Sequence, residues 1–261
     1  MVTSRYGSAQ PGTRLVHVLG MIRQLFDRDT CTYTYLLADE GKAVIIDPVL
    51  ERVDRDLQLL DELGLELVCV AETHVHADHV TAAATLRSFT GCSVIYGCDS
   101  GALGADTVVG DGDHVRFGSR YLIARETPGH TAGCVTYVLD DLSAAFTGDT
   151  LMVRGCGRTD FQEGDARTLY HSVHEKIFSL PDACVVYPGH DYKGRTCSTV
   201  GEERHFNPRL GAGKTEGDFA GIMAALQLSP PARIDVAVPA NLNAGAPWTQ
   251  PPPAPTVPDT L

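Results

Sequence analysis

The spacing of apolar and polar residues alternates between patterns typical of strands and of helices. β-Branched and aromatic residues alternate over residues 31–39, and an apolar run follows at 43–48, which predicts two strands joined by a glycine-containing turn. Residues 49–65 carry apolar side chains at helical spacing up to Gly64, so we expect a helix that ends there. The next apolar run, residues 66–74, predicts another strand and ends in a group of histidines.

The remainder of the chain repeats this order of strands followed by a helix. The Ala- and Leu-rich residues 78–91 predict a helix, and residues 165–181 predict another. Strands are predicted at residues 93–97, 113–118, 120–130, 134–141, 143–152 and 184–190. Two β-rich halves that each contain helices indicate an α/β protein with two sheets inside and helices outside.

Beyond these halves the chain continues into an extension and a tail. A helix at 218–228, followed by an extended segment, is predicted in the extension. Six prolines in residues 246–261 predict a disordered or extended tail. We therefore expect one domain over residues 14–245, of which 206–245 form the C-terminal extension.

The composition excludes some classes of function. A net charge of −12 would repel a phosphate backbone, so nucleic-acid binding is not expected. No stretch reaches the roughly 18 apolar residues of a membrane span, and the first residues lack the apolar core of a signal peptide. The eight cysteines form no C-x-x-C pair and lie scattered in apolar segments, as buried thiols do in a reducing compartment. We expect a cytoplasmic, bacterial protein without a signal or transit peptide.

The densest group of metal-binding side chains is the segment "THVHADH". It contains His74, His76, Asp78 and His79, placed between a predicted strand and the start of a predicted helix. Three imidazoles and a carboxylate within six residues indicate a metal site. These ligands suit zinc, iron or manganese and do not choose among them.

Further candidate ligands lie where predicted strands end. His130 stands in "TPGHTAG", Asp149 in "TGDT" and His190 in "YPGH". We expect Gly129 and Gly189 to let the backbone turn sharply and direct the histidine that follows each of them. The histidines without such a context are expected at the surface or in the core: His17, His114, His171, His174 and His205.

The motifs H-x-H-x-D-H, P-G-H-T, G-D-T and P-G-H, in this order, resemble those of the metallo-β-lactamase superfamily. The resemblance covers about residues 14–205. It implies the αββα sandwich, in which two β-sheets pack face to face with helices outside and the metal site lies at one edge between the sheets. The superfamily hosts hydrolases, oxygenases, reductases and nucleases, so the fold alone does not give the function.

Two branches with glutathione-linked substrates compete. Hydroxyacylglutathione hydrolases (glyoxalase II) use two metals and a bridging hydroxide that attacks a thioester. Persulfide dioxygenases use one ferrous iron and dioxygen. The segment "GRTDFQ" that follows "GDT" and "GCG" resembles the dioxygenase branch, since the hydrolases typically carry an aromatic, Glu-Gly stretch there. Residues 23–39, 187–210 and 234–242 resemble the same branch, which extends the resemblance to about residues 20–243.

The dioxygenase resemblance implies a ligand set of two histidines and one carboxylate. The matching residues are His74, His130 and Asp149, which would hold one Fe(II) per chain and leave coordination positions open for a sulfur and dioxygen. The residues of a vacant second metal site would orient these ligands by hydrogen bonding: His76, Asp78, His79 and His190.

The same resemblance implies residues that contact glutathione, whose two carboxylates suit the planar fork of an arginine. They match Arg158, Tyr192 and Arg209, with Thr131 and Cys156 nearby. Alternatives remain for three of them. Arg158 could pair with Asp160 or Glu163, Arg209 could form an ion pair that stabilises the fold, and Cys156 could be a lining residue or an oxidation-sensitive thiol.

The resemblance therefore implies oxidation of glutathione persulfide by dioxygen and water to sulfite and glutathione, as a step of sulfide oxidation. The alternatives are a binuclear glyoxalase II and a catalytically silent metal-binding scaffold. No rhodanese-like domain is evident, so we expect a separate enzyme to supply the persulfide. The sequence does not decide the oligomeric state, for which a homodimer is one option.

Overall fold

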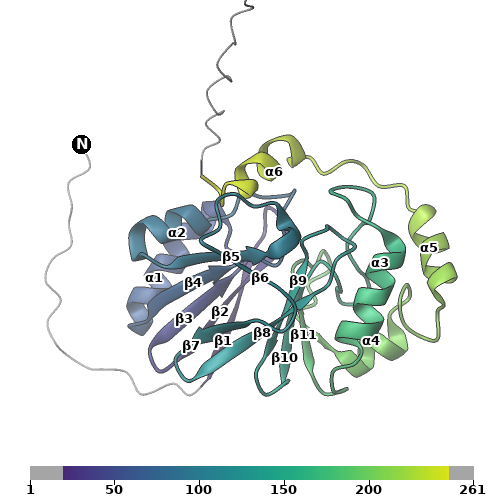
Figure 1. The fold of residues 1–261 in the computed structure, drawn as a ribbon, viewed down its shortest axis with the longest axis horizontal. Coiled ribbons are helices and arrows are strands. Elements are labelled where there is room, and N and C mark those ends of the chain that lie inside the picture. The colour runs from purple at the N-terminus through teal and green to yellow at the C-terminus, as the bar shows by residue number, and fades with distance from the viewer. Residues whose placement is uncertain (1–19, 247–261) are drawn as a thin grey trace, which may run out of the picture.

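The computed structural model describes residues 20–246, which form two six-stranded β-sheets packed face to face with helices on the outside (Figure 1). The αββα arrangement expected from the sequence is therefore confirmed. Residues 14–19 of the expected domain, which include His17, lie outside the described residues. So does all of the expected proline-rich tail except Ala246. None of the helices in residues 20–246 is long and apolar enough to cross a bilayer.

The first sheet has the strand order β1-β2-β3-β4-β5-β6. Its strands are β1 Met21–Asp27, β2 Thr32–Asp39, β3 Lys42–Ile46, β4 Glu66–Ala71, β5 Ser93–Gly97 and β6 Thr107–Val109. The first three pair antiparallel, and β3 to β6 pair parallel. The carboxyl ends of β3, β4 and β5 consequently lie at one edge of this sheet.

The second sheet has the order β12-β11-β10-β9-β8-β7. Its strands are β7 His114–Phe117, β8 Arg120–Glu126, β9 Val135–Leu139, β10 Ala144–Gly148, β11 Val185–Pro188 and β12 Ser198–Thr199. Since β9 is antiparallel to both β8 and β10, and β10 is parallel to β11, the strands β8, β10 and β11 all end at the same edge.

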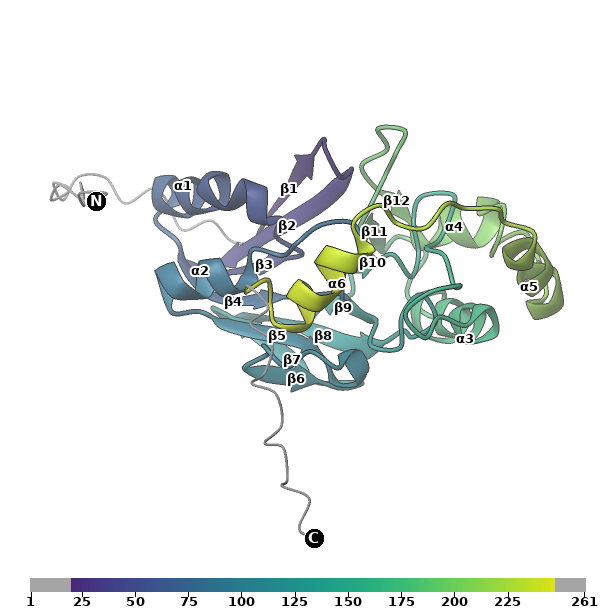
Figure 2. The ribbon, with the colours of Figure 1, turned by 90° about the horizontal axis from the view of Figure 1, so that it is seen from above.

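The helices lie on the two outer faces of the sandwich (Figures 1 and 2). They are α1 Val53–Leu63, α2 Ala83–Thr90, α3 Ala166–His171, α4 Val200–Phe206, α5 Glu216–Ala224 and α6 Ile234–Leu242, with short turns η1 Leu50–Arg52 and η2 Cys98–Ser100 and a π-helical stretch η3 Ser172–Ile177. The first two lie by the first sheet, and α3, α4 and α5 lie together at the opposite side of the molecule. The yellow segment that follows α5 returns across the molecule to α6.

Three apolar layers hold these elements together. Side chains from both sheets meet in the middle layer, among them Tyr35, Leu122 and Phe146. One outer layer packs α1, α2 and α6 on the first sheet, and the other packs α3, η3, α4 and α5 on the second. Full burial of one such side chain contributes roughly 1.5–3 kcal/mol to the stability of the fold. The packing of these layers therefore holds the two sheets in place and fixes how their edges face each other.

Two expectations from the sequence are wrong. The segment expected to be extended after residue 228 contains α6, although its residues include valines and Pro239. Packing of α6 on the first sheet outweighs these poor helix propensities. The helix expected at 78–91 begins only at Ala83, because the residues before it belong to the loop that carries the histidines.

Candidate metal centre

The candidate metal ligands leave the ends of strands that meet at one edge of the sandwich. His74 follows β4, His130 follows β8, Asp149 follows β10 directly and His190 follows β11. Strands from two different sheets thus bring together side chains that lie far apart in the chain. All four of these residues line one cavity.

The two glycines before the histidines act in different ways. Gly129 has a φ of +125°, and a Cβ there would overlap the backbone of Leu169, so only glycine allows this turn. Gly189 has no such φ, which corrects the expectation of a sharp turn. A Cβ at Gly189 would lie 2.7 Å from Oδ1 of Asp149, so this glycine is required for the close approach of two strand ends.

One atom each of His74, His130 and Asp149 lies within 4.8 Å of the others. Nε2 of His130 is 3.8 Å from Oδ2 of Asp149, and the two imidazole rings have centroids 4.9 Å apart. Whether this group can hold a cation depends on which lone pairs its neighbours leave free.

The surroundings of His74 leave its Nε2 free. The hydroxyl of Thr73 donates to Oδ2 of Asp47 at 2.7 Å and lies 2.9 Å from Nδ1 of His74. Since a hydroxyl carries one hydrogen, it accepts from Nδ1–H, and the lone pair of this imidazole is on Nε2. Burial, followed by the charges of His76 and His130, holds the pKa of His74 well below its usual range. The ring is therefore neutral, as a metal ligand must be.

His130 and Asp149 are prepared in the same way. Nδ1 of His130 donates to the carbonyl oxygen of Arg158 at 2.7 Å, which leaves Nε2 as the acceptor. Oδ1 of Asp149 accepts from Nδ1 of His190 at 2.7 Å, which leaves Oδ2. Burial alone would raise the pKa of Asp149, but the charge and hydrogen bond of His190 outweigh it and hold that pKa below its usual range. Two imidazoles, each with Nδ1 already bonded, and one carboxylate are thus a donor set that fits ferrous iron.

Three residues of the second metal set are hydrogen-bonded through Asp78. Oδ2 of Asp78 lies 2.9 Å from Nδ1 of His79 and 2.9 Å from Nε2 of His190, and accepts from the hydroxyl of Thr32 at 3.2 Å. Burial would lower the pKa of His190, but the carboxylates of Asp149 and Asp78 raise it well above its usual range. A protonated imidazole has no free lone pair. Nε2 of His79 is buried without a hydrogen-bond partner in residues 20–246.

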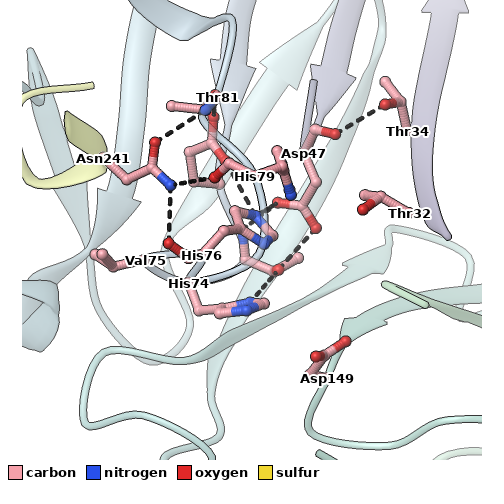
Figure 3. A network of polar contacts seen from close by, with 12 residues as sticks. Thr32, Thr34, Asp47, His74, Val75, His76, His79, Thr81, Asp149 and Asn241 are labelled. Atoms are coloured by element: carbon pink, nitrogen blue, oxygen red, sulfur yellow. Dashed lines mark hydrogen bonds and ion pairs between the residues drawn. The ribbon is translucent and has the colours of Figure 1, made fainter. Parts of the chain in front are cut away.

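His76 contacts a pair of buried acids that sequence reasoning missed. Its Nε2 lies 3.1 Å from Oδ1 of Asp47 (Figure 3). It also lies 3.3 Å from Oε2 of Glu72. Burial would lower the pKa of His76, but these two carboxylates raise it to about 10. The signal in the sequence was an acid at the end of each of two apolar runs, "VIIDP" and "CVAETH".

A cavity of about 750 Å³ opens beside the three candidate ligands. This volume lies in the range of about 300–1,000 Å³ typical of small-molecule sites. Of the residues expected to bind glutathione, the cavity is lined by Cys156, Arg158, Tyr192 and Arg209. Thr131 is not among the lining residues: it is buried, and its hydroxyl contacts Sγ of Cys134 at 3.2 Å.

Arg158 makes the ion pair that the sequence left open as its alternative. Its Nε and Nη2 donate to the two carboxylate oxygens of Asp160 at 2.6 and 2.7 Å, and Nη1 donates to the carbonyl of Ser229 at 2.7 Å. The guanidinium also lies 4.4 Å from the centre of the Phe161 ring. The side chain therefore ties the segment after Asp149 to the segment between α5 and α6.

Arg209 differs, since it has no ion pair within residues 20–246. Its Nη1 donates to the carbonyl of Cys156 at 3.1 Å and lies 3.8 Å from the sulfur. Burial, only partly offset by Arg209, raises the pKa of the Cys156 thiol to about 11. Tyr192 is 70% exposed, and its ring is stacked over His190 at a centroid distance of 6.1 Å.

All eight cysteines are free, and five of them are buried. The expectation of buried thiols is wrong for Cys98 and Cys197, which are exposed, and for Cys31, which is partly exposed. The four remaining histidines of the described chain take no part in the centre.

Residues 30–190 match the profile of the metallo-beta-lactamase superfamily, and the chain belongs to that superfamily. Within it the chain belongs with the persulfide dioxygenases. It is 56% identical over 228 residues to the mitochondrial persulfide dioxygenase ETHE1 of Homo sapiens, which covers 86% of this chain and 89% of that protein.

Solved structures agree. The crystal structure of ETHE1 from Myxococcus xanthus is 51% identical, has a TM-score of 0.84 and covers 86% of this chain and 99% of its own. A metallo-beta-lactamase from Staphylococcus aureus is 26% identical with a TM-score of 0.80, over 90% of this chain and 75% of its own.

Proposed function

We propose that the protein is a persulfide dioxygenase that acts at a single Fe(II) held by His74, His130 and Asp149. One glutathione persulfide, one dioxygen and one water would give one sulfite and one glutathione. The observation that carries the proposal is the convergence of two free Nε2 atoms and one free carboxylate oxygen. Each side chain is held in place by a hydrogen bond at its other polar atom, which is Nδ1 in the two histidines and Oδ1 in Asp149. The identity to proteins named persulfide dioxygenase supports the choice of substrate.

When bound there, ferrous iron would supply open coordination positions for the outer sulfur and for dioxygen, and a route for electrons between them. The chain's own contribution is to hold the ligands and to position the substrate. His190 would keep Asp149 turned through Oδ1, so that only Oδ2 faces the metal.

Substrate recognition in this proposal rests on the cavity wall. Arg209 is a cation without a carboxylate partner within residues 20–246, so it is the first candidate to pair with a glutathione carboxylate. Tyr192 would pack on the substrate at the rim. Arg158 can contribute only by exchanging Asp160 for the substrate, and Thr131 would act through the wall behind the cavity. The raised pKa of Cys156 keeps it a thiol, which favours a lining role.

The proposal extends to the setting of the reaction. Free cysteines at all eight positions fit a reducing compartment such as the cytoplasm. A separate enzyme would generate the persulfide. We also propose that the protein is a homodimer, and light scattering on the purified protein would test this by measuring its mass in solution.

A binuclear thioesterase is the second candidate, because Asp78, His79 and His190 retain the identities of a second metal site and Nε2 of His79 has no partner within residues 20–246. The hydrogen bonds of His190 to Asp78 and to Asp149 count against it.

The two reactions are separated by giving iron-loaded protein either glutathione persulfide or S-lactoylglutathione. We expect dioxygen uptake with sulfite formation from the first and little hydrolysis of the second. His130→Ala, which removes a proposed ligand, is the matched control. Rapid thioester hydrolysis without dioxygen uptake would decide for the thioesterase.

A further inference from the structure

A buried carboxamide from the C-terminal extension bonds to the loop that carries the histidines. Asn241 lies near the end of α6 and is fully buried. Its Nδ2 donates to the carbonyls of His76 at 2.9 Å and of His79 at 2.8 Å, and its Oδ1 accepts from the backbone N–H of Thr81 at 2.9 Å (Figure 3). One side chain thus satisfies three backbone groups of one loop.

These bonds matter because the loop has little regular structure of its own. It runs from the end of β4 at Ala71 to the start of α2 at Ala83, and most of it is buried. Buried backbone groups need partners, and a lost partner costs about 1–3 kcal/mol. A second carboxamide, Gln162, donates to the carbonyl of Val75 at 2.7 Å. The carbonyls just after His74 are therefore held from outside the loop.

The docking of α6 does not depend on the Asn241 side chain alone. The hydroxyl of Tyr96 donates to the backbone carbonyl of Asn241 at 3.0 Å. The backbone N–H groups of Ala84 and Leu103 donate to the carbonyls of Ala244 and Leu242, at 2.8 and 2.7 Å. The position of the helix and the bonds of the carboxamide can therefore be disturbed separately.

We propose that Asn241 is a positioning residue of the metal centre. Its carboxamide fixes the loop from His76 to Thr81, and with it the direction in which His74 presents Nε2. Metal affinity would consequently depend on a residue beyond the superfamily match, which ends at residue 190. The inference rests on the proposed metal centre but not on the reaction that this centre catalyses.

The test measures metal binding by the full-length apoprotein, with Co(II) as the probe in competition with a chelator. Asn241→Asp keeps an acceptor for Thr81 but turns an oxygen toward two carbonyls. Asn241→Leu removes all three side-chain hydrogen bonds at similar volume. We expect both to weaken Co(II) binding at least tenfold. Asn241→Ser, with a shorter polar side chain, should fall between them and wild type, and it serves if the larger changes prevent folding.

Tyr96→Phe is the matched control, because it removes one buried bond to the same residue and leaves the carboxamide intact. It should lower Tm and leave Co(II) affinity within about twofold of wild type. Folded Asn241 variants with wild-type affinity would overturn the inference. The inference would also be overturned if Tyr96→Phe lost as much Co(II) affinity as Asn241→Asp, since this would show a general loosening of the fold. Wild-type protein that binds Co(II) but, with iron, consumes no dioxygen would refute the proposed reaction and leave this inference standing.

Discussion

The carbonyl oxygen of Arg158 accepts a hydrogen bond from Nδ1 of His130 at 2.7 Å. A residue expected from the sequence to bind substrate thus orients a candidate metal ligand through its backbone. Its side chain meanwhile pairs with Asp160 and reaches Ser229. The backbone bond survives any substitution of the side chain, so the two roles can be separated.

For Arg158→Ala we accordingly expect unchanged iron content, because the carbonyl remains. Tm should fall, since the bonds to Asp160 and Ser229 are lost. The Michaelis constant for glutathione persulfide should rise less than in the Arg209 variant described next. Iron analysis, thermal unfolding and initial rates on one preparation check all three. If the Michaelis constant rose more than in the Arg209 variant while Tm stayed unchanged, Arg158 would be the main residue that binds a glutathione carboxylate.

Arg209→Ala should have the larger effect on substrate binding. A charge-assisted hydrogen bond to a carboxylate contributes about 1.5–3 kcal/mol, which corresponds to roughly ten- to a hundredfold in the Michaelis constant. Arg209→Lys should recover only part of the loss, because an ammonium lacks the planar fork. Steady-state kinetics of the two variants provide the test. If both variants had the Michaelis constant of the wild type, Arg209 would not be a substrate-binding residue.

The ligand set itself predicts a graded pattern of iron loss. His74→Ala, His130→Ala and Asp149→Ala each remove one of three ligands and should abolish both iron binding and dioxygen uptake. His190→Ala should retain most of the iron at saturating metal, because it contacts Asp149 rather than the cation. Metal analysis after gel filtration measures this. Iron loss from His190→Ala equal to that from His74→Ala would point to a two-metal centre.

Cysteine reactivity gives a check that is independent of the metal. Alkylation at neutral pH should modify the exposed Cys197 and leave the buried Cys156 untouched. Cys98 is exposed as well, but its hydrogen bond to Glu126 raises the pKa of the thiol to about 11. It should therefore react more slowly than Cys197, and faster as the pH approaches 11. Peptide mass spectrometry over time gives the order. Early modification of Cys156 would contradict its role as a protected lining residue.

The sequence identified the candidate metal ligands because they lie in short local motifs at the ends of apolar runs. It could not show that His76 turns toward Asp47 and Glu72, because those contacts join separate strand ends. For the same reason it could not show that Asp160, rather than Glu163, pairs with Arg158. The helix α6 was missed since its valines and Pro239 favour an extended backbone, and only packing on the first sheet overrides that preference.

The central claim is that one iron, held by His74, His130 and Asp149, supports persulfide oxidation. Its most direct test is an anaerobic titration of apoprotein with Fe(II), after which each sample receives glutathione persulfide and air-saturated buffer. We predict that the rate of dioxygen uptake rises linearly with iron and stops rising at one equivalent per chain, with one sulfite formed per dioxygen consumed. A break at two equivalents, or full loading without dioxygen uptake, would contradict the account.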